Sequence, residues 1–246
     1  MTENISQDSL VEATRERARF SGHGQAKGAA GYIEPFADPN SEFLSSPGQM
    51  SVINPRNDGF GIMRISAAWD NITITESRGG FLGRFIKKAV KQGVDIDLGC
   101  LYELQDGTRG CIQAFGELMG DFNDAPFITL SGDERTGDTP GDDEFLRING
   151  AGWSKIKRVL IYAYIYGGAA SWSAIRPQIQ LSVAGEYPMV VVPSVSQTSL
   201  PVCAVAMMEN VRNGLRMTNH SEYFPGHNEM DRAFGFGIAW TDGEKR

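Results

Sequence analysis

Short stretches of alternating or continuous apolar residues recur from about residue 60 to the end of the chain. They are rich in β-branched and aromatic side chains and are bounded by Gly, Pro, Asn or Asp, a pattern typical of strands. Two of the breaks, Asp106-Gly107 and Asn213-Gly214, carry residues that tight hairpin turns favour. The predicted strands are residues 60–67, 71–75, 94–104, 110–115, 126–130, 145–148, 158–166, 175–183, 189–192, 202–208, 215–218 and 233–240.

Many short strands with few helices predict an all-β protein, a β-sandwich of two mainly antiparallel sheets. One segment breaks the pattern, since residues 80–93 place apolar side chains on one helical face and four basic ones on the other. We therefore expect a short amphipathic helix insertion over residues 81–92. It could be a helix packed on a sheet, or a basic helix that docks on a partner or on a membrane surface.

Residues 1–49 differ from the rest because they are polar, with scattered Gly, Ser and Pro. We expect them to form a flexible N-terminal arm, with at most a short helix starting near Ser9. The sandwich is predicted over residues 50–241, followed by a C-terminal tail of residues 242–246.

The formal net charge of −7 lies entirely in residues 121–144, which hold eight acids against one base, whereas bases and acids balance elsewhere. A pI near 5.1 argues against a general nucleic-acid binder, which needs a basic face. No secretory signal and no transmembrane segment are recognisable, so we expect a cytoplasmic protein.

The three cysteines are widely spaced and odd in number, which favours free thiols. A hairpin centred on Asp106-Gly107 should place Cys100 opposite Gln113 and Cys111 opposite Tyr102. The two thiols would then be diagonal neighbours at best, which disfavours a disulfide.

The most distinctive chemistry is the run GDERTGDTPGDDE, residues 132–144, which holds six carboxylates between two predicted strands. Crowded carboxylates repel one another, and a hard cation with many oxygen ligands, such as Ca²⁺, removes that cost. An EF-hand is excluded because Arg135 and Asp138 occupy positions where that loop needs a ligand and a glycine. Zn²⁺ is disfavoured because no Cys or His accompanies the acids. The alternative is a solvated acidic loop.

A second acidic pair, Asp95 and Asp97, alternates with apolar residues in VDIDL. Alternate strand residues share a face, so both carboxylates should point the same way. They could converge with the acidic loop on one or two Ca²⁺ ions, or lie at a strand edge in water.

The acidic run resembles the signature of the tellurite-resistance TerD family, roughly G-D-N-L-T-G-x-G-x-G-D-D-E. VDIDL, the AAWD run ending at Asp70, KIKRVLIYAYIY and FGFGI resemble further motifs of that family, and the likeness is greatest for its TerA branch. The resemblance implies a Ca²⁺-binding β-sandwich with a cytoplasmic stress-response role and, as partners, other Ter proteins at the inner membrane surface. The ligands carried over by the matching motifs are Asp95, Asp97, Asp133, Asp142, Asp143 and Glu144.

An enzymatic role has little support, because His220, His227 and Cys203 match no nucleophile or metal motif. Three functions remain. The first is a non-enzymatic calcium-binding scaffold or sensor, which we favour. The second is a Ca²⁺-dependent membrane-binding module of the C2 kind, and the third is a metal-dependent hydrolase.

Overall fold

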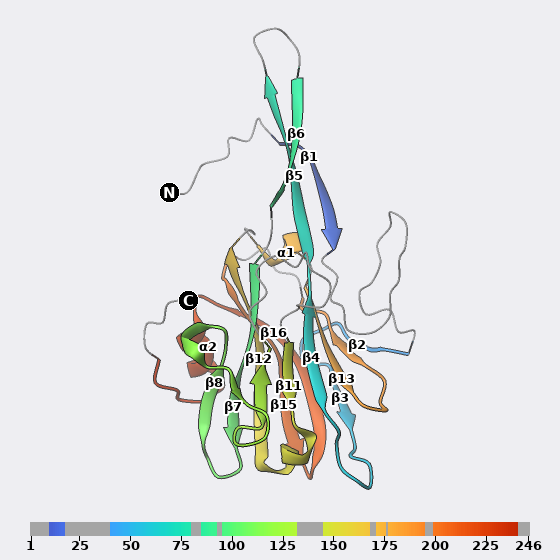
Figure 1. The fold of residues 1–246 in the computed structure, drawn as a ribbon, viewed down its shortest axis with the longest axis vertical. Coiled ribbons are helices and arrows are strands. Elements are labelled where there is room, and N and C mark those ends of the chain that lie inside the picture. The colour runs from blue at the N-terminus through green and yellow to red at the C-terminus, as the bar shows by residue number, and fades with distance from the viewer. Residues whose placement is uncertain are drawn as a thin grey trace.

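The computed structural model describes residues 10–17, 40–79, 85–92, 95–131, 145–167, 171–175, 177–194 and 199–240. These residues form two large sheets that pack face to face and one small sheet that extends from one end (Figure 1). The predicted all-β sandwich of mainly antiparallel strands is confirmed.

Sheet B has seven strands. Neighbouring strands in it run antiparallel, except β14 and β2, which run parallel. In spatial order the strands are β2 (Glu42–Leu44), β14 (Met189–Val191), β13 (Gln178–Val183), β4 (Met63–Ala68), β11 (Phe145–Ile148), β10 (Ile128–Leu130) and β9 (Gly120–Asp121).

Sheet C has six strands and is antiparallel throughout. In spatial order they are β3 (Met50–Ile53), β16 (Gly214–Phe224), β15 (Val202–Val211), β12 (Ile156–Gly167), β7 (Asp95–Leu104) and β8 (Arg109–Ile112).

The main core lies between sheets B and C, because successive side chains of a strand point to opposite faces. In β7, Ile96, Leu98 and Cys100 belong to this core, whereas Leu101 belongs to a second apolar cluster on the outer face of sheet C. The short helical elements are the 3₁₀ helices η2 (Phe115–Glu117) and η3 (Gly150–Lys155) and the α-helices α1 (Trp172–Ile175) and α2 (His227–Phe234).

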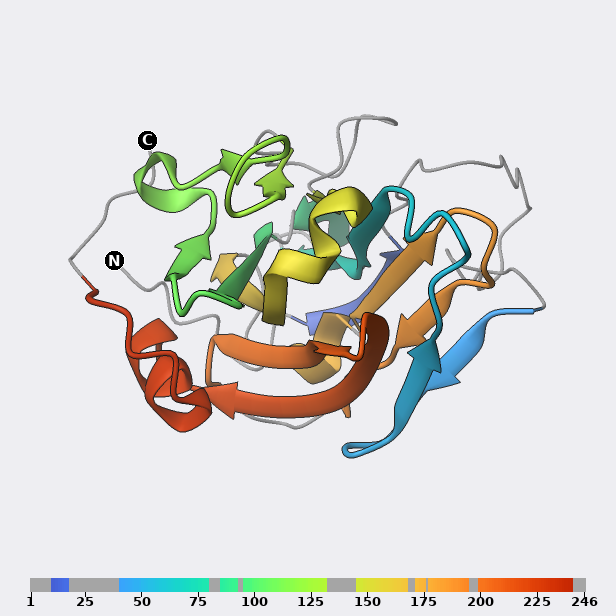
Figure 2. The same ribbon diagram turned by 90° about the horizontal axis from the view of Figure 1, so that it is seen from below.

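The second cluster is covered by α2 and residues 235–240, which lie along the outer side of sheet C (Figure 2). Gly99 makes room for this cluster, since a Cβ atom there would clash with the ring of Tyr162 on the neighbouring strand.

The predicted strand over residues 233–240 is wrong, because its first residues belong to α2. Gly235, with φ of 67°, ends α2 in the left-handed conformation, and no strand follows it among the described residues.

Sheet A consists of β1 (Leu10–Arg17), β5 (Asp70–Gly79) and β6 (Phe85–Gln92) in the order β1-β5-β6. The predicted helix over residues 81–92 is therefore wrong, because Phe85–Gln92 pairs with β5 along its whole length. Strand β5 contains the β-branched run ITIT, and pairing with it outweighs the helical periodicity of β6.

Part of the predicted N-terminal arm also belongs to the sheets. Leu10–Arg17 forms a strand rather than a helix, and Glu42–Leu44 joins sheet B, with Leu44 only 3% exposed. The sandwich therefore starts at β2 rather than at residue 50. Residues 1–9 and 18–39 of that arm lie outside the described ranges, as does the predicted tail of residues 242–246.

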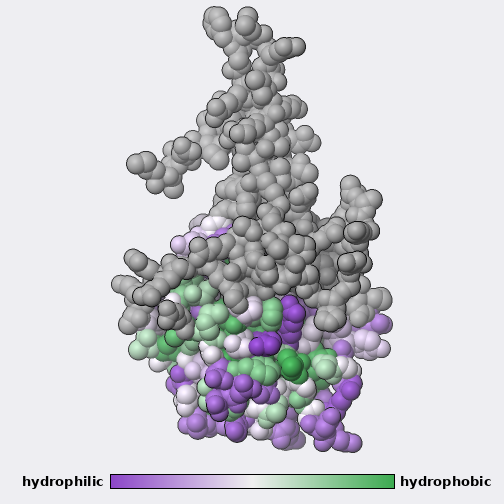
Figure 3. All heavy atoms as spheres, viewed as in Figure 1, coloured by the Kyte–Doolittle hydropathy of each residue, from purple (hydrophilic) through white to green (hydrophobic). Residues whose placement is uncertain are grey.

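On the face drawn in Figure 3, hydrophilic side chains gather at the end of the sandwich away from sheet A, and apolar ones are more frequent above them. Among the described residues, no helix combines the length and hydrophobicity required to cross a bilayer.

Candidate metal centre

The structure describes only two of the six predicted metal ligands. Asp95 and Asp97 lie in β7, whereas Asp133, Asp142, Asp143 and Glu144 lie outside the described residues. Within the described ranges no group of three or more His, Cys, Asp or Glu side chains is arranged to hold a metal ion. A complete site would therefore need ligands from residues 132–144.

Asp95 and Asp97 are the first residues on the outer face of β7. Their neighbours Ile96 and Leu98 point into the main core, so the two carboxylates share the opposite face, as the sequence predicts. Asp97 is only 3% exposed. An ionised carboxylate this deeply buried is expensive unless hydrogen bonds or a cation compensate it.

Strand β12 provides the neighbours of this pair, because Asp97 lies opposite Tyr164 and Asp95 lies opposite Gly167. Burial raises the pKa of the Tyr164 phenol above its ordinary value of 10.0, and the nearby charges of Asp97 and Tyr166 raise it further. The carboxylate and the phenol are thus electrostatically coupled, and Tyr164 is neutral at physiological pH.

The two residues that flank the acidic run, Ser131 and Phe145, are hydrogen-bonded to each other. Ser131 N donates to Phe145 O at 2.8 Å, and Phe145 N donates to Ser131 Oγ at 2.7 Å. The run therefore leaves and re-enters sheet B at a single point, between β10 and β11.

That point lies at the end of the sandwich from which sheet A extends, here called the sheet-A end. Phe145 pairs with Ser66 near the end of β4, which leads through Trp69 into β5. Strand β5 pairs Ile72 with Gln92 of β6, and β6 leads to Asp95. The carboxylate pair and the anchors of the acidic run therefore occupy the same end, which favours a shared cation site.

The acidic patch seen in the sequence is not one surface. Asp121 and Asp124 belong to the turn between β9 and β10, where Asp121 accepts hydrogen bonds from Asn123 N and Asp124 N. Ile128, which follows this turn, pairs with Ile148, and Ile148 pairs with Met63 at the other end of β4. Asp121 and Asp124 thus lie at the far end, away from Asp95.

Strand β7 carries a second buried carboxylate, Glu103, that was not among the predicted functional residues. Glu103 accepts hydrogen bonds from Arg158 Nε at 2.6 Å, Lys157 Nζ at 2.9 Å and Arg109 Nη2 at 3.2 Å. Burial alone would raise the pKa of Glu103, but the hydrogen bonds from these cations and the charge of Arg158 lower it from 4.5 to about 2. Opposite charges on strands paired with β7 are the signal that could have revealed this cluster.

The same two arginines tie the C-terminal segment to sheet C. Arg158 donates to Phe234 O at 2.9 Å and Gly235 O at 3.1 Å, and Arg109 donates to Phe236 O at 2.9 Å. Asp231, itself 3% exposed, accepts from Gly237 N, Ile238 N and Trp240 Nε1. Both buried acids therefore have structural roles.

The candidate nucleophiles are poorly placed for catalysis. All three cysteines are free, as predicted, and all three are buried, which raises the pKa of each thiol, to about 12 for Cys111. Cys100 lies opposite Ile112 rather than Gln113, a shift of one residue from the predicted register. Burial lowers the pKa of His227 to about 4, and its ring packs against Tyr162, Tyr164 and Trp240.

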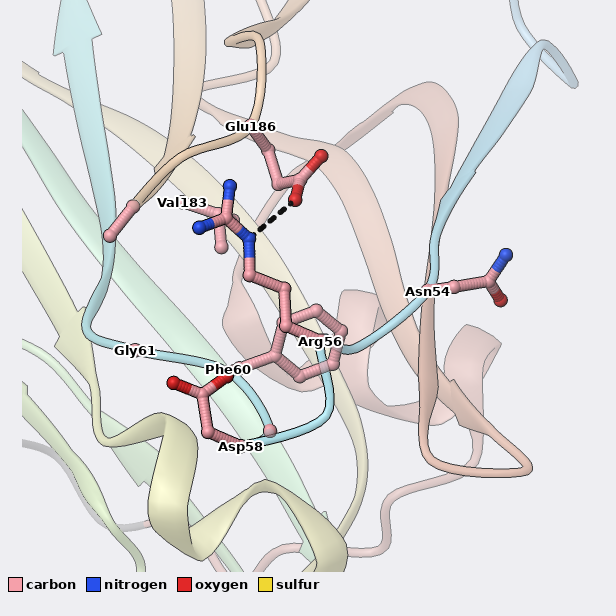
Figure 4. A pocket seen from close by; sticks show the side chains of 9 residues that line it. Asn54, Arg56, Asp58, Phe60, Gly61, Val183 and Glu186 are labelled. Atoms are coloured by element: carbon pink, nitrogen blue, oxygen red, sulfur yellow. Dashed lines mark hydrogen bonds and ion pairs between the residues drawn. The ribbon is translucent and has the colours of Figure 1, made fainter.

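A small cavity of about 190 Å³ lies at the far end (Figure 4). Arg56 crosses it and forms an ion pair with Glu186 at 3.3 Å, with Asp58 and Phe60 on its other side. Because Val183 pairs with Met63 at this end, the cavity is remote from Asp95 and Asp97.

Comparison with known proteins gives a relative and a structural likeness. The tellurium resistance protein TerA of Alcaligenes sp. is 36% identical over 186 residues, which are 76% of this chain and 53% of that protein. The chain thus spans about half the length of this curated relative. No family model matches the chain.

A solved structure of a homologue of the telluride resistance protein TerD from Streptomyces coelicolor gives a TM-score of 0.41 at 12% identity. The match covers 70% of this chain and 95% of that one. A score this low does not define the fold, which is established by the sheets described above. On the sequence match to TerA, together with the motifs at β7, β12 and the acidic run, the chain belongs to the tellurite-resistance TerD/TerA family.

Proposed function

We propose that this chain is a non-enzymatic calcium-binding protein of the tellurite-resistance stress response, acting in the cytoplasm as a scaffold or sensor with other Ter proteins. The observation that carries the proposal is Asp97, a buried carboxylate on the outer face of β7 at the sheet-A end. Both ends of a segment with six carboxylates are anchored at that same end.

Ca²⁺ suits this donor set better than other common ions. It takes six to eight oxygen ligands and tolerates irregular geometry, whereas Mg²⁺ requires a tight octahedron. The donors here are carboxylates, and the cysteines are buried in the apolar clusters, so a site of the zinc type has no support. Asp95 and Asp97 would hold one side of the ion, and Asp133, Asp142, Asp143 and Glu144 are the proposed ligands from the acidic run.

Binding rather than catalysis is favoured by the state of the other reactive groups. The cysteine thiols have raised pKa values, and His227 is stacked among aromatic rings. Bound Ca²⁺ would supply charge neutralisation, and Asp95 and Asp97 would orient the acidic run against β7. The membrane-binding alternative loses its main support, because the basic segment 85–92 is a strand rather than a helix.

Thermal unfolding of the full chain in EDTA, Mg²⁺ and Ca²⁺ tests the proposal. A site that exists only in the folded state should add about 2.7 kcal/mol of stability when free Ca²⁺ is 100 times its Kd. Mg²⁺ should add less.

Asp97→Asn should remove most of the Ca²⁺-dependent gain. Asp124→Asn is the matched control, because it removes one charge from the same acidic stretch but at the far end of sheet B. If the wild type gains nothing from Ca²⁺, or if both variants lose equally, the acidic run is only a solvated charged loop.

A further inference from the structure

The last described part of the chain forms a unit with its own internal hydrogen bonds. This unit, here called the C-terminal module, comprises α2 and residues 235–240 and lies along the outer side of sheet C (Figure 2). The backbone oxygen of Asp231 accepts from Gly235 N at 2.8 Å. Its carboxylate accepts from Gly237 N, Ile238 N and Trp240 Nε1. These bonds lie within the module, so they would survive its separation from the sheet.

Sheet C holds the module through side chains. Met230 and Phe236 are fully buried in the second apolar cluster, which also contains Leu160 of β12. Arg158 and Arg109 donate to three backbone carbonyls of the module. Among the described residues, no backbone–backbone hydrogen bond joins the module to a strand of sheet C. The module is therefore seated on a finished sheet, as a separate ligand would be.

The covalent link between the module and the sheet is short and extended. Strand β16 ends at Phe224 and α2 begins at His227, so Pro225 and Gly226 form the whole link. Gly226 has φ of −167° and ψ of 174°, so the link makes no turn there. A glycine backbone rotates easily because it has no Cβ atom. Rotation at Gly226 would swing the module away from its own sheet as one piece.

We propose that the C-terminal module is exchanged between two copies of this chain, each copy docking it on the outer face of the other's sheet C. The buried contacts of Phe236 and the arginine–carbonyl bonds would be the same in the closed chain and in the exchanged dimer. The two forms would then differ mainly in the link and in the freedom lost on association. A second copy is the occupant that this surface fits, because the surface is already complementary to the module. The proposal does not depend on calcium binding.

The mass of the full chain, measured by light scattering over a range of protein concentrations, tests the exchange. The wild type should form a dimer at high concentration. Deletion of Pro225 and Gly226 should prevent the module from reaching its own sheet and tighten the dimer about tenfold or more. Insertion of Gly-Ser-Gly after Gly226 should weaken the dimer about tenfold, because a longer link favours closure within one chain. The same insertion after Gly107, in the turn between β7 and β8, is the matched control and should leave the dimer unchanged.

Quenching of tryptophan fluorescence by acrylamide shows whether the module is docked. Trp69, Trp153 and Trp172 are at most 4% exposed, so a change in quenching reports on Trp240. In the deletion variant, Trp240 should stay as shielded as in the wild type, since the second copy provides the sheet.

Three outcomes would overturn the proposal. A wild type that stays monomeric at every concentration has no exchange. A deletion variant that is monomeric with Trp240 open to quenching would show that a second copy does not accept the module. A dimer that neither change in the link affects would place the association at another surface. Ca²⁺-dependent melting of the variant with the longer link separates this proposal from the previous one, because that variant should keep the full calcium response.

Discussion

Strand β7 carries two buried carboxylates on the same face, Glu103 and Asp97, and the strands paired with β7 place different groups opposite them. Glu103 is 2% exposed and Asp97 is 3% exposed. Glu103 receives hydrogen bonds from three cationic side chains at 2.6 to 3.2 Å. Across from Asp97, the sheet places the neutral phenol of Tyr164.

The two acids are assigned different roles: Glu103 holds structure, and Asp97 is the proposed metal ligand. At Glu103 the protein supplies the positive charge itself, and the same arginines hold the backbone of Phe234, Gly235 and Phe236. At Asp97 the neighbouring strand provides an aromatic ring, and the acidic run is anchored at the same end. Burial of a carboxylate is thus informative only together with the groups that face it.

The largest expected effect is the loss of Glu103. Glu103→Gln keeps the shape of the side chain but leaves three cations around a neutral group, which should cost about 3 kcal/mol of unfolding free energy. For a chain of this size, that corresponds to a fall in Tm of about 6–12 °C. Urea unfolding at neutral pH measures the loss of unfolding free energy.

The matched control is Glu209→Gln, at the equivalent row of the same sheet. Glu209 pairs with Arg216 at 2.7 Å, but both side chains are about one-third exposed. Exposed pairs contribute about 1 kcal/mol or less. Equal losses from the two variants would show that the cluster around Glu103 is no stronger than a surface ion pair.

The same cluster predicts how stability depends on acid. The pKa of Glu103 is about 2 in the folded chain against 4.5 ordinarily, so its contribution is fully present above about pH 4.5. It is lost as pH falls from 4.5 toward 2, because the unfolded state binds the proton first. The difference in unfolding free energy between wild type and Glu103→Gln should therefore shrink over that range. A constant difference would contradict the assigned pKa.

A smaller loss of unfolding free energy is expected when Asp231, which holds the C-terminal segment, is replaced. Asp231→Asn replaces one acceptor oxygen by an NH2 group, so the side chain loses either the hydrogen bond from Gly237 N or the two from Ile238 N and Trp240 Nε1. The expected loss is about 1–3 kcal/mol. Glu229→Gln in the first turn of α2, which is exposed, is the control. Trp fluorescence should report release of Trp240 before global unfolding; a single transition with unchanged midpoint would contradict the proposed role of Asp231.

Strand positions were predictable because the residues that pack between the sheets alternate or form β-branched runs. Strand β12 is the clearest case, and the shared face of Asp95 and Asp97 follows from the same alternation. The Asp106-Gly107 hairpin was also located, although its register is shifted by one residue. Hairpin register depends on the geometry of the turn, which residue types specify only in part.

The errors came from segments whose structure depends on distant partners. The periodicity of residues 85–92 is helical, yet their pairing with β5 decides the outcome. Lys157 and Arg158 are more than fifty residues from Glu103 in sequence, so no local pattern links them. The separation of Asp124 from the acidic run, in contrast, follows from the predicted strand over residues 126–130, which the structure shows as β10 between them.

The smallest effect, and the most direct test of the contrast within β7, concerns the titration of Tyr164. Burial raises the pKa of its phenol first, and the negative charge of Asp97 raises it further because it opposes the phenolate. Asp97→Asn should therefore lower the Tyr164 pKa, but burial should keep it above 10.0. Saturating Ca²⁺ should lower it in the wild type and have little effect in Asp97→Asn, since a bound cation offsets the same charge. NMR titration of tyrosines labelled at Cζ, with Tyr164→Phe used to assign the signal, resolves it from the other six tyrosines. A Tyr164 pKa that responds neither to the substitution nor to Ca²⁺ would show that Asp97 is already neutralised within the protein, as Glu103 is, and the contrast between the two ends of β7 would disappear.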